Sequence, residues 1–154
     1  MNLKATLSPN DLARACADAM WKDDSASSGL GMKIVDIGPG RATLTMTVQP
    51  HMVNGQRIAH GGFIFALADS AFAFACNSHN EKAVAAQGNI TFIRSGRLGD
   101  RLVATAREIS RSGRSGIYDV RVTVGDEVIA EFRGHSRTIG GTWLPAGETD
   151  SKKK

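Results

Sequence analysis

The chain has 154 residues, enough for one domain that buries a hydrophobic core without disulfides or a structural metal. Hydrophobic residues make up 42% of it and charged residues 22%, which is ordinary for a soluble globular protein. The formal net charge is +4, but lysines 152–154 supply three of these charges, so the rest of the chain is close to neutral. Because basic residues are not gathered with aromatic ones elsewhere, we expect no nucleic-acid partner.

The cysteines and the start of the chain favour a cytoplasmic protein. Cys16 and Cys76 both lie within apolar helical patterns, which indicates buried, reduced thiols. No secretory signal opens the chain, since Asp11 and Arg14 interrupt the early residues and no apolar stretch follows. The apolar run 63–76 is shorter than the roughly 20 residues that span a bilayer, and it contains a carboxylate. We therefore expect no membrane partner.

The first third of the chain predicts a helix followed by two strands. Residues 8–22 combine a capping serine, a proline in the first turn and one apolar face, which is typical of a helix. The segment 23–31 is rich in Ser and Gly and is interpreted as a linker or loop. Residues 32–37 and 41–48 predict two strands around a Gly-Pro-Gly turn, and the second alternates apolar residues with threonines.

The rest of the chain predicts one apolar helix and a run of antiparallel strands. The helix covers residues 61–77 and follows a polar loop. Strands are predicted after it at residues 84–94, 101–110, 116–124 and 127–138. Periodicity ends near residue 140, so we predict a single domain over residues 1–139 and a flexible polar tail over 140–154.

The order of these elements predicts the fold class. A lone helix that is apolar nearly all round must be buried, and a sheet is the only partner large enough to cover it. We therefore predict an α+β domain in which an antiparallel sheet wraps around one central helix, with an additional N-terminal helix. Alanines along the central helix would let backbone or another helix approach closely.

Asp69 is the only carboxylate in the apolar run 63–76. Its neighbours three and four positions away are apolar, and no Lys, Arg or His occurs between residues 61 and 78 to pair with it. A buried carboxylate without a partner has a raised pKa and is a candidate general base or nucleophile. The alternative is a hydrogen-bonded residue of the core.

The start of the central helix, His60-Gly61-Gly62, suggests a second function. The N–H groups of a first helical turn lack intrahelical acceptors and carry the positive end of the helix dipole. Glycine lets a ligand come close, so a carbonyl oxygen there would be polarised and a developing oxyanion stabilised. The alternative is that the two glycines only relieve close packing at the helix entry.

Together the two features predict a dimer. Asp69 lies eight residues after Gly61, which is about 12 Å along a helix axis. A base and an oxyanion donor that act on one carbonyl must both lie within a few ångströms of it. If the two cooperate, Asp69 comes from a second copy whose helix runs antiparallel, which gives a two-fold dimer with two equivalent composite sites.

The segments HMVNGQRIAHGGFIFALADSAFAFACNS and FIRSGRLGD resemble the hotdog-fold acyl-CoA thioesterases of the phenylacetic-acid-degradation type, and the resemblance covers roughly residues 10–138. It implies a hotdog fold with sites at a homodimer interface, often in a homotetramer made of two dimers. It also implies that Asp69 activates water or attacks the thioester, and that the Gly61 N–H contacts the oxyanion. Asn54 would orient the water or the carboxylate, and His60 would either donate to the thioester carbonyl or hold the loop.

The resemblance implies an acyl-CoA substrate with an aryl or arylacetyl group, and the phosphates of coenzyme A are anionic. Arginines at strand ends or turns can meet such phosphates. The candidates for substrate binding are Gly62 and Ser70 on the helix and Arg94, Arg97, Arg111 and Arg114 outside it.

The favoured function is hydrolysis of an acyl-CoA by water, with neither a metal nor an organic cofactor. Four histidines and two cysteines show no zinc-binding spacing, so we expect no metal site. One alternative is a hotdog dehydratase or hydratase, which would leave the thioester bond intact. Another is a non-catalytic acyl-CoA sensor, which would need an output module and would leave its ligand unchanged.

Overall fold

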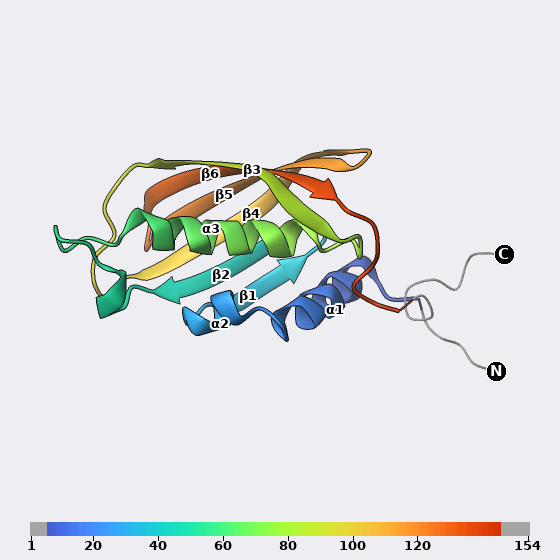
Figure 1. Cartoon of the computed structure of the whole chain (residues 1–154), viewed down its shortest axis with the longest axis horizontal. Coiled ribbons are helices and arrows are strands. Elements are labelled where there is room, and N and C mark those ends of the chain that lie inside the picture. Colours follow the sequence, from blue (N-terminus) through green and yellow to red (C-terminus); the bar gives the residue numbers. More distant parts are fainter. Residues whose placement is uncertain (1–5, 146–154) are drawn as a thin grey trace.

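In the computed structural model, which describes residues 6–145, a six-stranded sheet curls around one long helix (Figure 1). The strands lie in the order β1-β2-β4-β5-β6-β3, and all neighbouring strands are antiparallel. The elements along the chain are α1 (Pro9–Trp21), α2 (Ser25–Gly29), β1 (Lys33–Gly38), β2 (Arg41–Thr47), the 3-10 helix η1 (Pro50–Met52), α3 (Gly61–Cys76), β3 (Ala83–Phe92), β4 (Arg101–Ser112), β5 (Ser115–Val124) and β6 (Glu127–Thr138).

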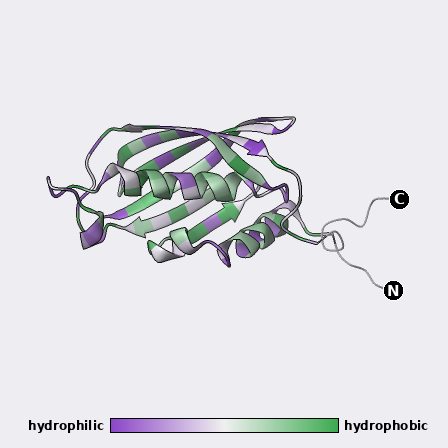
Figure 2. Cartoon of the chain, viewed as in Figure 1, coloured by the Kyte–Doolittle hydropathy of each residue, from purple (hydrophilic) through white to green (hydrophobic). Residues whose placement is uncertain are grey.

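The predicted helices and strands agree with this structure to within two residues at each end. Alternation was a reliable guide because β4, β5 and β6 bury every second residue against α3 over much of their length. Figure 2 shows the same pattern as alternating polar and apolar bands along the strands. The predicted α+β class, with one central helix and an additional N-terminal helix, is confirmed.

The segment 23–31, expected to be a linker or loop, contains the short helix α2. Its N-cap is Asp24, whose carboxylate accepts a hydrogen bond of 2.9 Å from the Ser27 N–H. The helix is five residues long and rich in serine, so it has no apolar periodicity by which to detect it.

Residues 140–145, expected to begin a flexible tail, instead pack against the domain. The side-chain oxygen of Asn80 accepts hydrogen bonds of 3.0 Å from the N–H groups of Trp143 and Leu144. The Trp143 indole donates to Asn77 Oδ1 at 2.8 Å, and Leu144 is only 8% exposed. These partners lie more than 60 residues earlier in the chain, which is why local pattern did not indicate them. The remainder of the predicted tail, 146–154, lies outside the described residues.

The core lies between α3 and the concave face of the sheet. Phe72 of α3 packs on Gly134 of β6, where an added Cβ would lie 2.8 Å from the ring, so the strand needs glycine there. The ring also contacts Tyr118 and Phe132 at centroid distances of 5.6 and 5.8 Å. Burying one such aromatic side chain contributes roughly 1.5–3 kcal/mol. The helix is therefore fixed on the sheet by large side chains at one face.

The other face of α3 and the edge strand β3 remain open. In the view of Figure 1 no described element crosses in front of the middle of α3, and several residues in the middle of this helix are partly exposed. Strand β3 pairs with β6 alone among the described strands, and eight of its ten residues are exposed. It also has no charged residue, although natural edge strands are usually charged, short or covered.

In the part of the chain that the structure describes, no helix is long and apolar enough to cross a membrane.

Candidate active site

The loop before α3 folds back on itself and fixes where the helix begins. Val53 and Ala59 form an antiparallel bridge, and the Asn54 N–H donates to the Ile58 carbonyl at 2.9 Å. The Ala59 N–H donates to the Gly96 carbonyl at 2.8 Å, and the His60 N–H donates to the Met52 carbonyl at 2.7 Å. Because both sides of the loop are held, the first turn of α3 has a defined position.

The Asn54 side chain uses its oxygen to hold this loop. Oδ1 accepts hydrogen bonds from the N–H groups of Gln56 at 2.9 Å and Ile58 at 3.4 Å. The two N–H donors of Nδ2 have no partner among residues 6–145. Asn54 can therefore donate to a carboxylate, a carbonyl or a water oxygen, while its acceptor is already engaged.

His60 caps α3. Its Nδ1 accepts a hydrogen bond of 2.9 Å from the Gly62 N–H, so the proton of the neutral ring is on Nε2. Of the two roles considered for His60, this contact is the one that holds the helix start. It also uses the Gly62 N–H, so that group, a candidate for substrate binding, already has an acceptor. The Nε2–H remains as a donor on an exposed side chain.

Gly61 has both properties considered for the glycine pair, close packing at the helix entry and a free backbone N–H. A Cβ at this position would lie 2.8 Å from Phe92 Cζ, so glycine does relieve close packing where β3 ends. At the same time, the Gly61 N–H has no hydrogen-bond acceptor in the described chain. It is a free donor at the positive end of the α3 dipole.

Asp69 lies near the middle of α3 and is partly exposed. Its carboxylate has no hydrogen bond or ion pair with any described residue. Burial raises the pKa of Asp69 above the usual range of an aspartate. Burial also raises the pKa of Cys76 to about 12, and the Asp69 charge contributes to that shift.

Helix α3 is continuous from Gly61 to Cys76, so the separation expected from the sequence applies. The eight residues between Gly61 and Asp69 place them about 12 Å apart along the axis. Within one chain, the free N–H and the unpaired carboxylate cannot both reach one carbonyl group.

The four candidate arginines lie in two groups at opposite ends of α3, and all four are exposed. Arg94 and Arg97 follow β3 near the helix start, where Arg97 forms an antiparallel backbone β-bridge with Ile58. Arg111 and Arg114 lie at the β4–β5 hairpin near the helix end. One chain therefore does not bring the four together.

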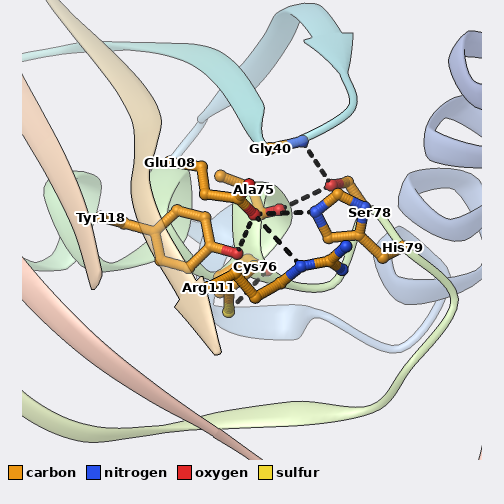
Figure 3. Close-up of polar contacts among 9 residues, drawn as sticks. Gly40, Ala75, Cys76, Ser78, His79, Glu108, Arg111 and Tyr118 are labelled. Atoms are coloured by element: carbon orange, nitrogen blue, oxygen red, sulfur yellow. Dashed lines mark hydrogen bonds and ion pairs between the residues drawn. The ribbon is translucent and has the colours of Figure 1, made fainter. Parts of the chain in front are cut away.

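Arg111 belongs to a polar cluster that the sequence analysis did not find (Figure 3). Glu108 Oε1 accepts hydrogen bonds from the Tyr118 hydroxyl at 2.7 Å and from His79 Nε2 at 2.9 Å, and Arg111 Nε lies 3.8 Å away. Burial alone would raise the pKa of Glu108, but the two hydrogen bonds and the Arg111 charge together lower it. We call these four residues the Glu108 cluster. Hairpin register could have suggested the pairing of Glu108 with Tyr118, but His79 comes from a distant loop.

A polar groove of about 840 Å³ lies on the outer face of the sheet and contains none of the predicted site residues. Its charged side chains pair across strands, with 2.7 Å between Arg121 and Glu131 and 2.6 Å between Arg133 and Asp119. These pairs are open to solvent, which screens them.

Comparison with known proteins identifies the family. The thioesterase superfamily matches residues 56–131. Acyl-coenzyme A thioesterase PaaI of Escherichia coli (strain K12) is 44% identical over 127 residues, which are 82% of this chain and 91% of that protein. The solved structure of the E. coli PaaI protein superposes with a TM-score of 0.86 at 42% identity, over 88% of this chain and 99% of that one.

A further solved structure shows the same fold with a ligand. The protein smu.793 from Streptococcus mutans UA159, bound to acetyl CoA, matches with a TM-score of 0.70 at 28% identity, over 72% of this chain and 90% of that one. The chain belongs to the thioesterase superfamily and has its hotdog fold. The comparisons confirm the prediction of an acyl-CoA thioesterase similar to PaaI, the protein of phenylacetic acid degradation.

Proposed function

We propose that the chain hydrolyses aryl- or arylacetyl-CoA to the free acid and coenzyme A, in a composite site between two copies. The observation that carries this proposal is the Asp69 carboxylate, which is partly buried, unpaired in the described chain and raised in pKa on an otherwise apolar helix. Such a group is a candidate general base. Water is the second substrate, and the reaction needs neither a metal nor an organic cofactor.

The open faces of the domain support the dimer. Strand β3 is a long, uncharged edge that would pair with its own copy across a two-fold axis. With the two α3 helices antiparallel and crossing near Phe65, Gly61 of one copy lies opposite the partner's Asp69. The same arrangement places the end of one α3, with its arginines, beside the start of the other, so the two arginine groups meet around one site. Two such dimers would form the tetramer.

The chemistry follows from the free groups. The thioester oxygen accepts from the Gly61 N–H, with the helix dipole favouring the negative charge that develops on it. Asp69 of the other copy takes a proton from water, whose oxygen attacks the carbonyl carbon. The C–S bond then breaks, and the thiolate of coenzyme A receives the proton. Asn54 Nδ2 and His60 Nε2 are the remaining donors beside this path.

The first test is release of free thiol from a panel of aryl-, arylacetyl- and alkyl-CoA substrates by the wild type and by Asp69→Asn. We expect release from the aromatic substrates, lost in a variant that still folds. An enoyl or hydroxyacyl product with its thioester intact would instead identify a dehydratase or hydratase. Tight binding of acyl-CoA without any turnover would identify a sensor.

The composite site is tested by mixing two variants of reduced activity, Asp69→Asn and Gly61→Ala. A mixed dimer holds one site with both changes and one site with neither, so random exchange of subunits should restore about a quarter of wild-type activity. Sedimentation would check that the mixture is dimeric or larger. Absence of restoration after verified exchange would place Gly61 and Asp69 in separate functions.

A cytoplasmic location, supported by the two buried free cysteines, completes the proposal.

A further inference from the structure

Ser70, which follows Asp69 on α3, is held by the short helix α2. Its hydroxyl lies 2.8 Å from the hydroxyl of Ser27, and this is its one hydrogen bond within residues 6–145. Ser27 is only 1% exposed, whereas Ser70 is partly exposed. The contact therefore connects a buried group to the open side of α3.

The direction of the hydrogen bonds in this chain of groups is fixed. The Ser27 hydroxyl donates to Asp24 Oδ2 at 2.7 Å, which uses its only hydrogen. It must then act as acceptor toward Ser70, so the Ser70 hydroxyl donates to Ser27. Since a hydroxyl has one hydrogen and two lone pairs, Ser70 offers only acceptor capacity to its open side. Without α2 and its Asp24 cap, the hydroxyl would be free to rotate.

Ser70 and Asp69 border one open patch of α3. Ala66, Asp69, Ser70 and Ala73 are spaced i, i+3, i+4 and i+7, which places them around one point on a helix surface, and all four are partly exposed. The Asp69 and Ser70 side chains diverge by about 100° around the axis, so they do not face each other directly. The two alanines leave room between them for a small molecule that contacts both.

We propose that Ser70 is a positioning residue for the water that hydrolyses the thioester, an inference that rests on the function proposed above. A water molecule that attacks a carbonyl carbon must direct a lone pair at it, which requires acceptors for its two hydrogens. Asp69 accepts one hydrogen and Ser70 the other. As the water oxygen bonds to the carbonyl carbon, Asp69 takes the first proton and passes it to the sulfur when the C–S bond breaks. The second hydrogen stays on the new carboxylic acid, which then ionises.

The test compares substitutions within this chain of hydroxyls, with kcat and KM measured by thiol release. Ser70→Ala removes the acceptor, and we expect kcat to fall about tenfold with KM changed less than about twofold. Ser70→Thr keeps a hydroxyl and should retain most of kcat. Ser27→Ala breaks the same link between α2 and α3 but leaves the Ser70 hydroxyl in place, so its loss of kcat should be smaller, about threefold.

Ser28→Ala is the matched control. It removes a hydroxyl from the same helix, but within residues 6–145 the Ser28 hydroxyl donates only to the backbone carbonyls of Asp24 and Ser25, and we expect wild-type kinetics. Equal losses for Ser70→Ala and Ser27→Ala would show that the contact only attaches α2 and would overturn the proposal. So would an unchanged kcat for Ser70→Ala. If the wild type itself released no thiol from any substrate, the proposed function would fail first, and the two failures are thereby distinguished.

Discussion

The polar groups near the two ends of helix α3 differ in whether they have hydrogen-bond partners. At the C-terminal end, Glu108 is engaged by Tyr118 and His79, and the Ser78 hydroxyl accepts from the Gly40 N–H and donates to the Ala75 carbonyl (Figure 3). From its N-terminus to its middle, the Gly61 N–H and the Asp69 carboxylate have no partner within residues 6–145.

The difference has an energetic meaning. A polar group that is removed from water stabilises the fold only if it is hydrogen-bonded, and it opposes folding if it is not. The paired end therefore contributes to stability, whereas the unpaired region keeps donors and a carboxylate available to a ligand. Substitutions at the two ends should separate stability from activity.

The largest effect is expected for Asp69→Asn. Loss of a general base should lower kcat for thiol release by about 10²- to 10⁴-fold. The same change removes a partly buried charge that has no partner, so thermal stability at neutral pH should stay the same or increase. A large fall in melting temperature, with activity lost in proportion to unfolding, would contradict this assignment.

Gly61→Ala should come next in size. The added methyl group lies at the free N–H and displaces the Phe92 ring, so we expect kcat to fall by about 10- to 100-fold. Phe92 is 50% exposed and its ring can move, so the melting temperature should change little. Circular dichroism beside the kinetic assay would check both statements. If the Gly61→Ala variant kept its activity, the Gly61 N–H would be excluded as the oxyanion donor.

Tyr118→Phe tests the opposite end. It removes the donor that holds Glu108 and should reduce the free energy of unfolding by about 1–2 kcal/mol, measured by urea denaturation. We expect kcat for thiol release per folded molecule to be unchanged, because Tyr118 is buried and its hydroxyl contacts Glu108 rather than Gly61 or Asp69; an effect passed on through Arg111 should change KM alone. A kcat that fell more than the folded fraction would show that the two ends are coupled.

The smallest effect is in the pH dependence of stability, where the two carboxylates should differ in sign. The pKa of Glu108 is lowered, so its favourable contribution is present above its ordinary value of about 4.3 and is lost as pH falls through the folded-state pKa. The pKa of Asp69 is raised, so its contribution is absent at low pH. It becomes unfavourable as pH rises from about 3.9 through the folded-state pKa.

Unfolding curves between pH 3 and 7 for Glu108→Gln and Asp69→Asn would measure these contributions. Relative to each variant, the wild type should gain stability with rising pH at position 108 and lose it at position 69. The same sign at both positions would contradict the comparison between the two ends.

The sequence by itself determined the positions of the long helices and the strands, and it singled out Asp69 as the candidate base. Alternation along the strands and the apolar run of the central helix depend on neighbouring residues, so they fix local structure and which face is buried. Asp69 was recognisable because a carboxylate without a nearby cation conflicts with the run around it. The His-Gly-Gly motif likewise marked the helix start, and the resemblance around it predicted the family correctly.

Only the tertiary structure decided which polar groups are used and which remain free. His60 accepts a hydrogen bond from the Gly62 N–H, and Glu108 accepts from residues of two other segments of the chain. Ser27 and Ser70, which are 43 residues apart in the sequence, form a hydrogen bond. The segment 140–145 is likewise fixed by Asn77 and Asn80. Each contact joins residues whose geometry depends on how the whole sheet closes around α3, and no local pattern carries that information.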